Sequence, residues 1–152
     1  MAFLVIRMRG TVNVPHWANS TLENLNLSKK FRATIVPESR EYLGMLHRIK
    51  QLVAWCHVDN ETVKELLDKK GRKSASRSLR DSDLSNEDTS LDKLAVDIAN
   101  DTVVLSKLNW IKPWFALNPP RGGFKKTVKK QSSQKGILGD NKSLLDLVKK
   151  MM

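Results

Sequence analysis

The sequence contains a single cysteine and no long apolar run, and both absences narrow the class of protein. Cys56 cannot form an internal disulfide, which is typical of a protein in a reducing compartment. No apolar stretch approaches the ~18 residues that a membrane-spanning helix needs. The longest one near the start, from Ala2 to Ile6, is too short for a signal peptide and lacks a cleavage site. We therefore expect a cytoplasmic protein with no membrane partner.

Motifs for catalysis, metals and cofactors are also missing. The chain has neither a Gly-x-Gly-x-x-Gly pattern nor a P-loop, and no Ser-His-Asp set has a recognisable nucleophile context. The three histidines with Cys56 could be imagined as a metal site. However, adjacent Cys56 and His57 point to opposite faces of a strand, and no Cys-x-x-Cys or His-x-x-x-His exists. The sequence predicts no enzyme, no metal, no cofactor and no small-molecule substrate.

Acidic residues are scarce at both ends of the chain. The net charge is +11, from 27 Lys and Arg against 16 Asp and Glu. Residues 1–58 carry eight basic residues against three acidic ones, and residues 109–152 carry ten against two. Residues 59–108 are nearly neutral, with nine against eleven. This layout favours two ends that face a polyanion and a middle that faces solvent or protein.

Apolar patterns over residues 1–58 predict a β-α-β-α-β core. Leu4–Met8 alternates with period two, and residues 31–36 and 53–58 are rich in strand-forming residues. Between them, helices are expected to begin near Pro15 and after an N-cap at Ser39. Two helices cannot cover both faces of three strands, so the fold class is α+β with one sheet face open to a partner.

The remaining residues predict two extensions. Residues 59–111 form a helical extension whose first helix ends at Gly71 and whose next begins at Thr89 or Ser90, with a mobile loop near 72–88 between them. Residues 112–152 form a basic extension. Its prolines and glycines predict irregular structure up to a terminal helix, which Ser143 and Asp146 open as a capping box.

The stretch from Pro119 to Lys135 is the clearest candidate for nucleic-acid contact, because it contains six basic residues and no acidic one. Its glycines let the backbone pass close to a phosphate chain, and its aromatic ring offers a stacking face. An exposed tail kept for solubility is the alternative. We expect the stretch to be disordered alone and ordered on RNA. The candidate residues are Arg121, Gly122, Gly123, Phe124, Lys125, Lys126, Lys129, Lys130 and Lys135.

Three further groups of candidates lie in residues 1–58: the end of the first strand with its loop, a cluster before the second strand, and the second helix. The alternatives are an ordinary loop, a Trp packed in the core and a solvated helix face. Gly44, inside the second helix, costs about 1 kcal/mol relative to Ala. It serves either close approach of a strand or RNA backbone, or tight helix-to-sheet packing. The candidates are Arg7, Arg9, Gly10, Thr11, Asn13, His16, Trp17, Lys29, Lys30, Arg32, Arg40, Arg48 and Lys50.

Four sequence blocks in a fixed order resemble a known family. They are Arg7-Met-Arg-Gly-Thr-Val-Asn-Val14, Tyr42-Leu-Gly-Met-Leu46, Val53-Ala-Trp55 and Phe115-Ala-Leu-Asn-Pro-Pro-Arg-Gly-Gly-Phe-Lys125. On these blocks the chain resembles the archaeal form of the large-subunit ribosomal protein L-thirty family, whose eukaryotic counterpart is L-seven. The resemblance covers nearly the whole chain, whereas a bacterial-type member would stop near Val58.

The resemblance implies a three-stranded antiparallel sheet with two helices on one face, similar to a truncated ferredoxin-like fold. It also implies a structural constituent of the large ribosomal subunit that binds folded rRNA by electrostatic and shape recognition. Its partners would be large-subunit rRNA and neighbouring large-subunit ribosomal proteins in the cytoplasm. The residues alone leave open a different, non-ribosomal RNA-binding or regulatory protein, a DNA-binding protein, or an enzyme acting on RNA.

Overall fold

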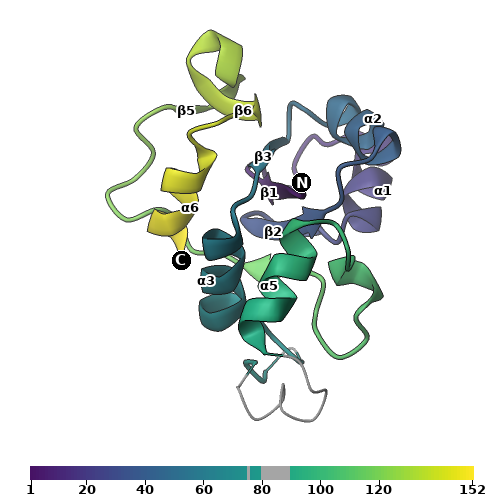
Figure 1. Ribbon diagram of the computed structural model, residues 1–152. Helices are drawn as coiled ribbons and strands as arrows, with labels where there is room; N and C mark the ends of the chain where they lie inside the picture. Colours follow the sequence, from purple (N-terminus) through teal and green to yellow (C-terminus); the bar gives the residue numbers. More distant parts are fainter. Residues whose placement is uncertain (75, 80–89) are drawn as a thin grey trace.

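The centre of the fold is an antiparallel arrangement of three strands, seen in a computed structural model that describes residues 1–74, 76–79 and 90–152 (Figure 1). Strand β1 (Phe3–Arg7) lies between β2 (Arg32–Val36) and β3 (Val53–His57) and is antiparallel to both. Helices α1 (His16–Asn24) and α2 (Arg40–Arg48) connect them. The expected β-α-β-α-β order is confirmed.

Helices α1 and α2 cover one face of this sheet. Phe3, Val5 and Trp55 on the strands pack with Leu22 of α1 and Leu46 of α2 in one buried cluster. The caps explain why the helices begin where they do. The proline before α1 has φ −59°, which is compatible with the start of a helix, and the Ser39 hydroxyl accepts a hydrogen bond from the backbone N–H of Tyr42.

The opposite face of the sheet is also covered, so the expectation of an open face is wrong. Helices α3 (Asn60–Lys70), α5 (Leu91–Ala99) and α6 (Leu144–Met151) supply apolar side chains that pack with Leu4 and Ile6 in a second buried cluster. Figure 1 shows α3 and α5 side by side, away from α1 and α2. The residues after position 58 complete the core, and every residue of β1 is buried.

The expectation of irregular structure after residue 111 is wrong as well. Strands β4 (Phe115–Ala116), β5 (Thr127–Gln131) and β6 (Gly136–Asp140) extend the sheet to the order β4-β2-β1-β3-β6-β5 among the described residues. Strand β6 is parallel to β3, and β5 is parallel to β6. The prolines lie between these strands and not in them. The sheet therefore has more than the three strands predicted.

Among the described residues, short 3-10 helices occupy two connections, at η2 (Leu105–Lys107) and η3 (Ser132–Gln134). The first lies in the apolar segment before Trp110. The second lies inside the basic stretch and ends at Lys135, whose φ of 59° reverses the chain before β6. Together with β5, it gives the Pro119–Lys135 stretch regular structure that the sequence analysis does not predict.

Gly71 ends α3, as predicted, but not through the left-handed conformation that glycine usually adopts there. Its φ is −60°, and a Cβ at this position would lie 2.2 Å from the carbonyl oxygen of Leu67. The close approach of the last helical turn is therefore what requires glycine. Of the predicted 72–88 loop, Arg72 and Ser78 form an isolated antiparallel bridge, and residues 75 and 80–88 lie outside the described residues.

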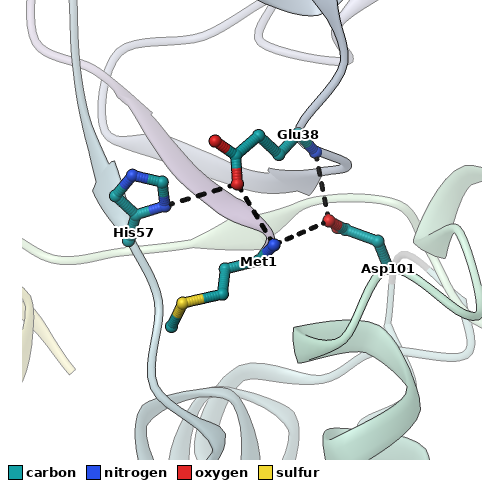
Figure 2. Close-up of polar contacts among 4 residues, drawn as sticks. All are labelled: Met1, Glu38, His57 and Asp101. Atoms are coloured by element: carbon teal, nitrogen blue, oxygen red, sulfur yellow. Dashed lines mark hydrogen bonds and ion pairs between the residues drawn. The ribbon is translucent and has the colours of Figure 1, made fainter.

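The amino terminus links the two halves of the chain (Figure 2). The Met1 ammonium lies 3.1 Å from Glu38 Oε2 and 3.1 Å from Asp101 Oδ2, and Glu38 Oε2 is 4.0 Å from Nδ1 of His57. The ammonium donates hydrogen bonds to the carboxylates of Asp101 and Glu38, and these bonds, with that to Asp101 the larger effect, raise the pKa of the ammonium. Because Met1 and Glu38 are exposed, these ion pairs contribute little to the stability of the fold.

Candidate RNA-binding surface

Arg7 is the one predicted contact residue that the structure buries completely, with 1% of its surface exposed. Its Nε donates to the carbonyl oxygen of Arg9 at 2.9 Å, and its terminal nitrogens donate to the carbonyls of Gly10, Leu27 and Ser28 at 2.8 to 3.0 Å. Burial lowers the pKa of Arg7 below its ordinary value. The guanidinium is therefore hydrogen-bonded to four backbone carbonyls and connects the loop after β1 with the loop before β2.

The first of those loops presents the predicted residues of the segment after β1. Arg9, Gly10, Thr11, Asn13 and His16 are all exposed. Asn13 has a φ of 58°, a left-handed conformation that asparagine tolerates better than most residues.

Trp17 is 45% exposed at the start of α1. The Arg48 guanidinium carbon lies 5.0 Å from the centre of its ring, so α2 and the loop after β1 form one continuous surface.

The second loop carries the basic cluster before β2. Lys29 and Lys30 are exposed, and Arg32 is half-buried with its guanidinium carbon 4.1 Å from the centre of the Trp114 ring. Lys30 Nζ lies 4.7 Å from the centre of the Phe31 ring. These contacts hold the cluster against the residues that precede the Pro119–Lys135 stretch.

Phe124 connects this cluster to the Pro119–Lys135 stretch. Its ring stacks on Phe31, with centroids 5.9 Å apart, and it packs against the core. A half-buried ring in this position anchors the stretch, whereas the sequence analysis proposes that it stacks on a base. The aromatic contact explains how a segment rich in lysine is held to the folded domain.

The basic side chains of the stretch itself point to solvent. Gly122 and Gly123 make a turn with φ of 80° and 75°, closed by a hydrogen bond from Gly123 N–H to the Pro120 carbonyl at 3.0 Å. These positive φ values, which residues with a Cβ rarely adopt, account for both glycines. The six exposed cations are Arg121, Lys125, Lys126, Lys129, Lys130 and Lys135.

A cavity of about 240 Å³ lies between this stretch and α6. Lys125 and Lys126 line it together with Lys150 of α6, over a partly apolar floor that includes Ile137 and Leu147. The Arg121 N–H donates to the Lys150 carbonyl at 3.1 Å, which brings the two segments together. Lys150 is therefore a candidate that sequence reasoning missed, because a lysine in the last turn of a helix is ordinary there.

Helices α3 and α5 have a different electrostatic character. On α3 and α5, Lys64 pairs with Asp92, and Lys69 pairs with Glu65 at 3.6 Å. Basic and acidic side chains alternate there, as the near-neutral charge of residues 59–108 predicts. The excess of positive charge thus lies on residues 9–50 and 119–150.

Cys56 is buried in β3. Burial, with smaller effects from Asp140 and Asp59, raises the pKa of the Cys56 thiol to about 12, so the thiol is protonated and poorly nucleophilic. Within the described ranges, no three His, Cys, Asp or Glu side chains are placed to hold a metal ion. No helix in this part of the chain is both long enough and apolar enough to cross a membrane.

Comparison with known proteins identifies the family. Residues 3–53 match the family model described as "Ribosomal protein L30p/L7e". Over 99% of the chain, the sequence is 44% identical to the "Large ribosomal subunit protein uL30" of Cenarchaeum symbiosum and 43% identical to that of Nitrosopumilus maritimus, covering 98% of each. The protein of the same description from Korarchaeum cryptofilum is 40% identical, with 97% and 93% covered. The chain belongs to this ribosomal protein family.

The match to the L30p/L7e model spans β1, α1, β2 and α2 and ends where β3 begins. It therefore includes the Arg7 hydrogen bonds, the loop after β1 and the basic face of α2. The archaeal relatives align over nearly the whole chain, which also brings in the Pro119–Lys135 stretch and α6. The resemblance inferred from the four sequence blocks is confirmed.

Proposed function

We propose that this chain is a structural component of the large ribosomal subunit that binds and stabilises folded rRNA. The observation that carries the proposal is the connection of the exposed basic groups of residues 9–50 and 119–135 into one surface. Three sets of contacts make this connection: the hydrogen bonds of Arg7, the Arg48–Trp17 contact and the Phe31–Phe124 stack. The archaeal relatives described as large ribosomal subunit proteins support the same conclusion.

Binding on this surface is electrostatic and follows shape. Each lysine or arginine that neutralises a phosphate releases a counterion, and the fold sets the spacing of the charges. Folded RNA is recognised mainly through its backbone and 2′-hydroxyls, with few contacts to base edges. The role is architectural and not catalytic, and it requires no small-molecule substrate or membrane.

Neighbouring ribosomal proteins are the second class of partner. The α3–α5 side, with its paired charges, suits contact with protein or solvent, while the basic surface faces rRNA. In a cell the chain would then reside in cytoplasmic ribosomes. Sedimentation tests this: the protein should travel with large subunits and leave them only at high salt. Recovery mainly in the free fraction at low salt would contradict the ribosomal role and favour another RNA-binding function.

Removing four charges from the Pro119–Lys135 stretch should weaken binding to protein-free large-subunit rRNA without unfolding the domain. The slope of log affinity against log salt should fall in magnitude by up to about 3, because each lost phosphate contact contributes a little under one. Filter binding over a salt series measures this slope. The substitutions are Lys125→Ala, Lys126→Ala, Lys129→Ala and Lys130→Ala.

A matched variant removes four lysines from α3 and α5 and so changes the net charge equally. Its slope should stay close to that of the unmodified chain, since these side chains lie outside the proposed surface. Equal loss of slope in the two variants would mean that net charge alone drives binding. The control substitutions are Lys64→Ala, Lys69→Ala, Lys70→Ala and Lys93→Ala.

A further inference from the structure

Gly44 lies exposed in the middle of α2, where glycine weakens a helix relative to alanine. Exposed helical positions are the ones at which a stronger helix former is easiest to accommodate. A glycine at such a position needs an explanation, which is either packing within this chain or contact with a binding partner.

Packing within the chain does not supply the reason. A Cβ built on Gly44 meets no atom within 4 Å, and the residue has the ordinary φ of a helix. Gly71 and Gly136 are different, because a Cβ on either would lie within about 2.2 Å of a carbonyl oxygen. The tight helix-to-sheet packing considered for Gly44 is therefore wrong, and the bare backbone faces outward.

The side chains around Gly44 indicate what approaches it. Its neighbours three and four positions away on the helix are Arg40, Glu41, His47 and Arg48, all exposed. Glu41 lies in the first turn, where it is favourable to the helix dipole. The two arginines lie on the face of Gly44, one turn before it and one turn after it.

This face continues into the basic surface described above. Arg48 stands over the exposed ring of Trp17, which leads to the loop after β1. Lys50 extends the positive charge beyond the end of the helix. A polyanion bound to the loop can therefore also contact basic side chains across α2. Gly44 is the position on this face where no side chain covers the helix backbone.

We propose that an RNA sugar-phosphate backbone makes its closest contact with α2 at Gly44, with Arg40 and Arg48 bound to phosphates on either side. This inference rests on the proposed rRNA-binding function and names the site within it. The absent side chain lets the RNA backbone reach the helix surface, and the arginines, one turn to each side, supply the charge. A protein partner fits less well, because the face is rich in unpaired positive charge.

Substituting Gly44 by larger residues distinguishes an RNA-contact role from a structural role. The two roles predict changes of opposite sign in the thermal midpoint. Gly44→Ala and Gly44→Gln should raise the thermal midpoint, because both residues favour helix. Both should weaken binding to protein-free large-subunit rRNA of Nitrosopumilus maritimus, by about tenfold for Ala and more for Gln. The salt slope should change little, since no charge is removed. Arg40→Ala should instead reduce its magnitude by about one.

The matched control is Val96→Ala on α5. Val96 is also exposed on a helix, and alanine is again the better helix former, so the thermal midpoint should not fall and rRNA affinity should be unchanged. Wild-type affinity in Gly44→Ala would overturn the inference while leaving rRNA binding by the parent chain intact. A lower thermal midpoint would also overturn it, by showing a structural role.

Incorporation into large subunits distinguishes an RNA contact at α2 from a contact with a neighbouring protein. Unchanged affinity for free rRNA with reduced incorporation of Gly44→Ala would assign α2 to a protein neighbour and overturn the RNA contact. Failure of the unmodified chain to bind the rRNA would overturn the proposed function itself. Reduced affinity together with a raised thermal midpoint is the result that supports contact at Gly44.

Discussion

Arg7 lies at the end of β1 and contacts four backbone carbonyls with one guanidinium. Period two places Arg7 and Arg9 on the same side of the strand, and the sequence analysis treats both as surface cations. Helix α1 and its flanking loops cover that side as far as Arg7 but not as far as Arg9. Two arginines with the same local pattern therefore have different roles, one fixing the loops and the other exposed on them.

Replacing Arg7 should cost far more stability than replacing Arg9. Arg7→Met leaves buried carbonyls without donors and should lower the free energy of unfolding by about 3 kcal/mol. Arg7→Lys keeps the charge but not the forked set of donors, so it should fall between Arg7→Met and the parent chain. Urea unfolding followed by circular dichroism measures the losses.

The matched variant is Arg9→Met, whose side chain is exposed, and its effect should stay within about 0.5 kcal/mol. Similar losses for the two methionine variants would contradict the structural role of Arg7. Because Arg7 orders the loops that present Arg9 and Lys29, Arg7→Lys should also reduce rRNA affinity under conditions where the chain remains folded.

At the scale of elements, the local sequence predicts the starts of α2 and α5 but not the cap of α6. Ser39 and Ser90 cap α2 and α5 as expected, each accepting from a backbone N–H three residues on. Both have extended backbone, which aims the hydroxyl at the first turn. Ser143, with ψ of 8°, makes no cap hydrogen bond, so the predicted capping box at Ser143 and Asp146 is wrong.

Asn141 organises the start of α6 instead. Its Oδ1 accepts from the backbone N–H of Ser143 at 3.1 Å and from the hydroxyl at 2.8 Å, and its Nδ2 donates to the Ile137 carbonyl at 3.2 Å. The side chain thus joins β6 to α6 while 4% exposed. Neither role can be read from neighbouring residues, because the Ile137 carbonyl becomes a partner only once β6 is formed.

Asn141→Ala should therefore destabilise the protein by about 2 kcal/mol, through the lost cap and a buried carbonyl left unpaired. Ser143→Ala, the substitution that the predicted capping box makes important, should cost about 0.5 kcal/mol because only the hydroxyl contact is lost. Thermal or urea unfolding of both variants decides between the two residues. A larger effect at Ser143 would show that the hydroxyl is the cap.

Strands β5 and β6 also depend on distant partners. The β5 sequence Thr-Val-Lys-Lys-Gln has exposed or half-buried side chains throughout, so it lacks the alternating pattern that marks a strand. Strand β6 contains two glycines, which favour a loop locally. Parallel pairing with β3 buries Ile137 and Leu138 and gives this segment its conformation.

At the scale of the whole molecule, residues 59–152 supply the cover for one face of the central sheet. Leu4, Ile6, Ile35 and Cys56 all pack against side chains from this part of the chain. A fragment ending at Val58 would expose a continuous apolar face, and exposed patches of this kind promote aggregation. The basic surface is likewise assembled from both ends of the chain.

A protein ending at Val58 should consequently fail to form a stable monomer. We expect it to bind a hydrophobic dye such as ANS strongly, to lack a cooperative thermal transition and to associate in sedimentation, while the full chain does none of these. Substituting Leu4 and Ile6 by Ser in the fragment should lessen the association. A monomeric, cooperatively folding fragment would contradict the structural need for α3, α5 and α6.

The sequence by itself determined the β-α-β-α-β order, the cap at Ser39, a helix start at Thr89 or Ser90, the basic ends and the family resemblance. These features depend on local periodicity, on hydrogen bonds within a single turn or on composition, all of which are present in neighbouring residues.

Only the tertiary structure decided that both faces of the sheet are covered, that Arg7 is buried and that Phe124 is an anchor. It also decided that a Cβ at Gly44 would meet no atom within 4 Å. Each of these features depends on which segment of the chain packs against the residue. The spacing of apolar residues predicts the face of a helix or strand on which a side chain lies, but it does not predict what covers that face. For the same reason, only the fold joins separate basic clusters into the one surface proposed to bind rRNA.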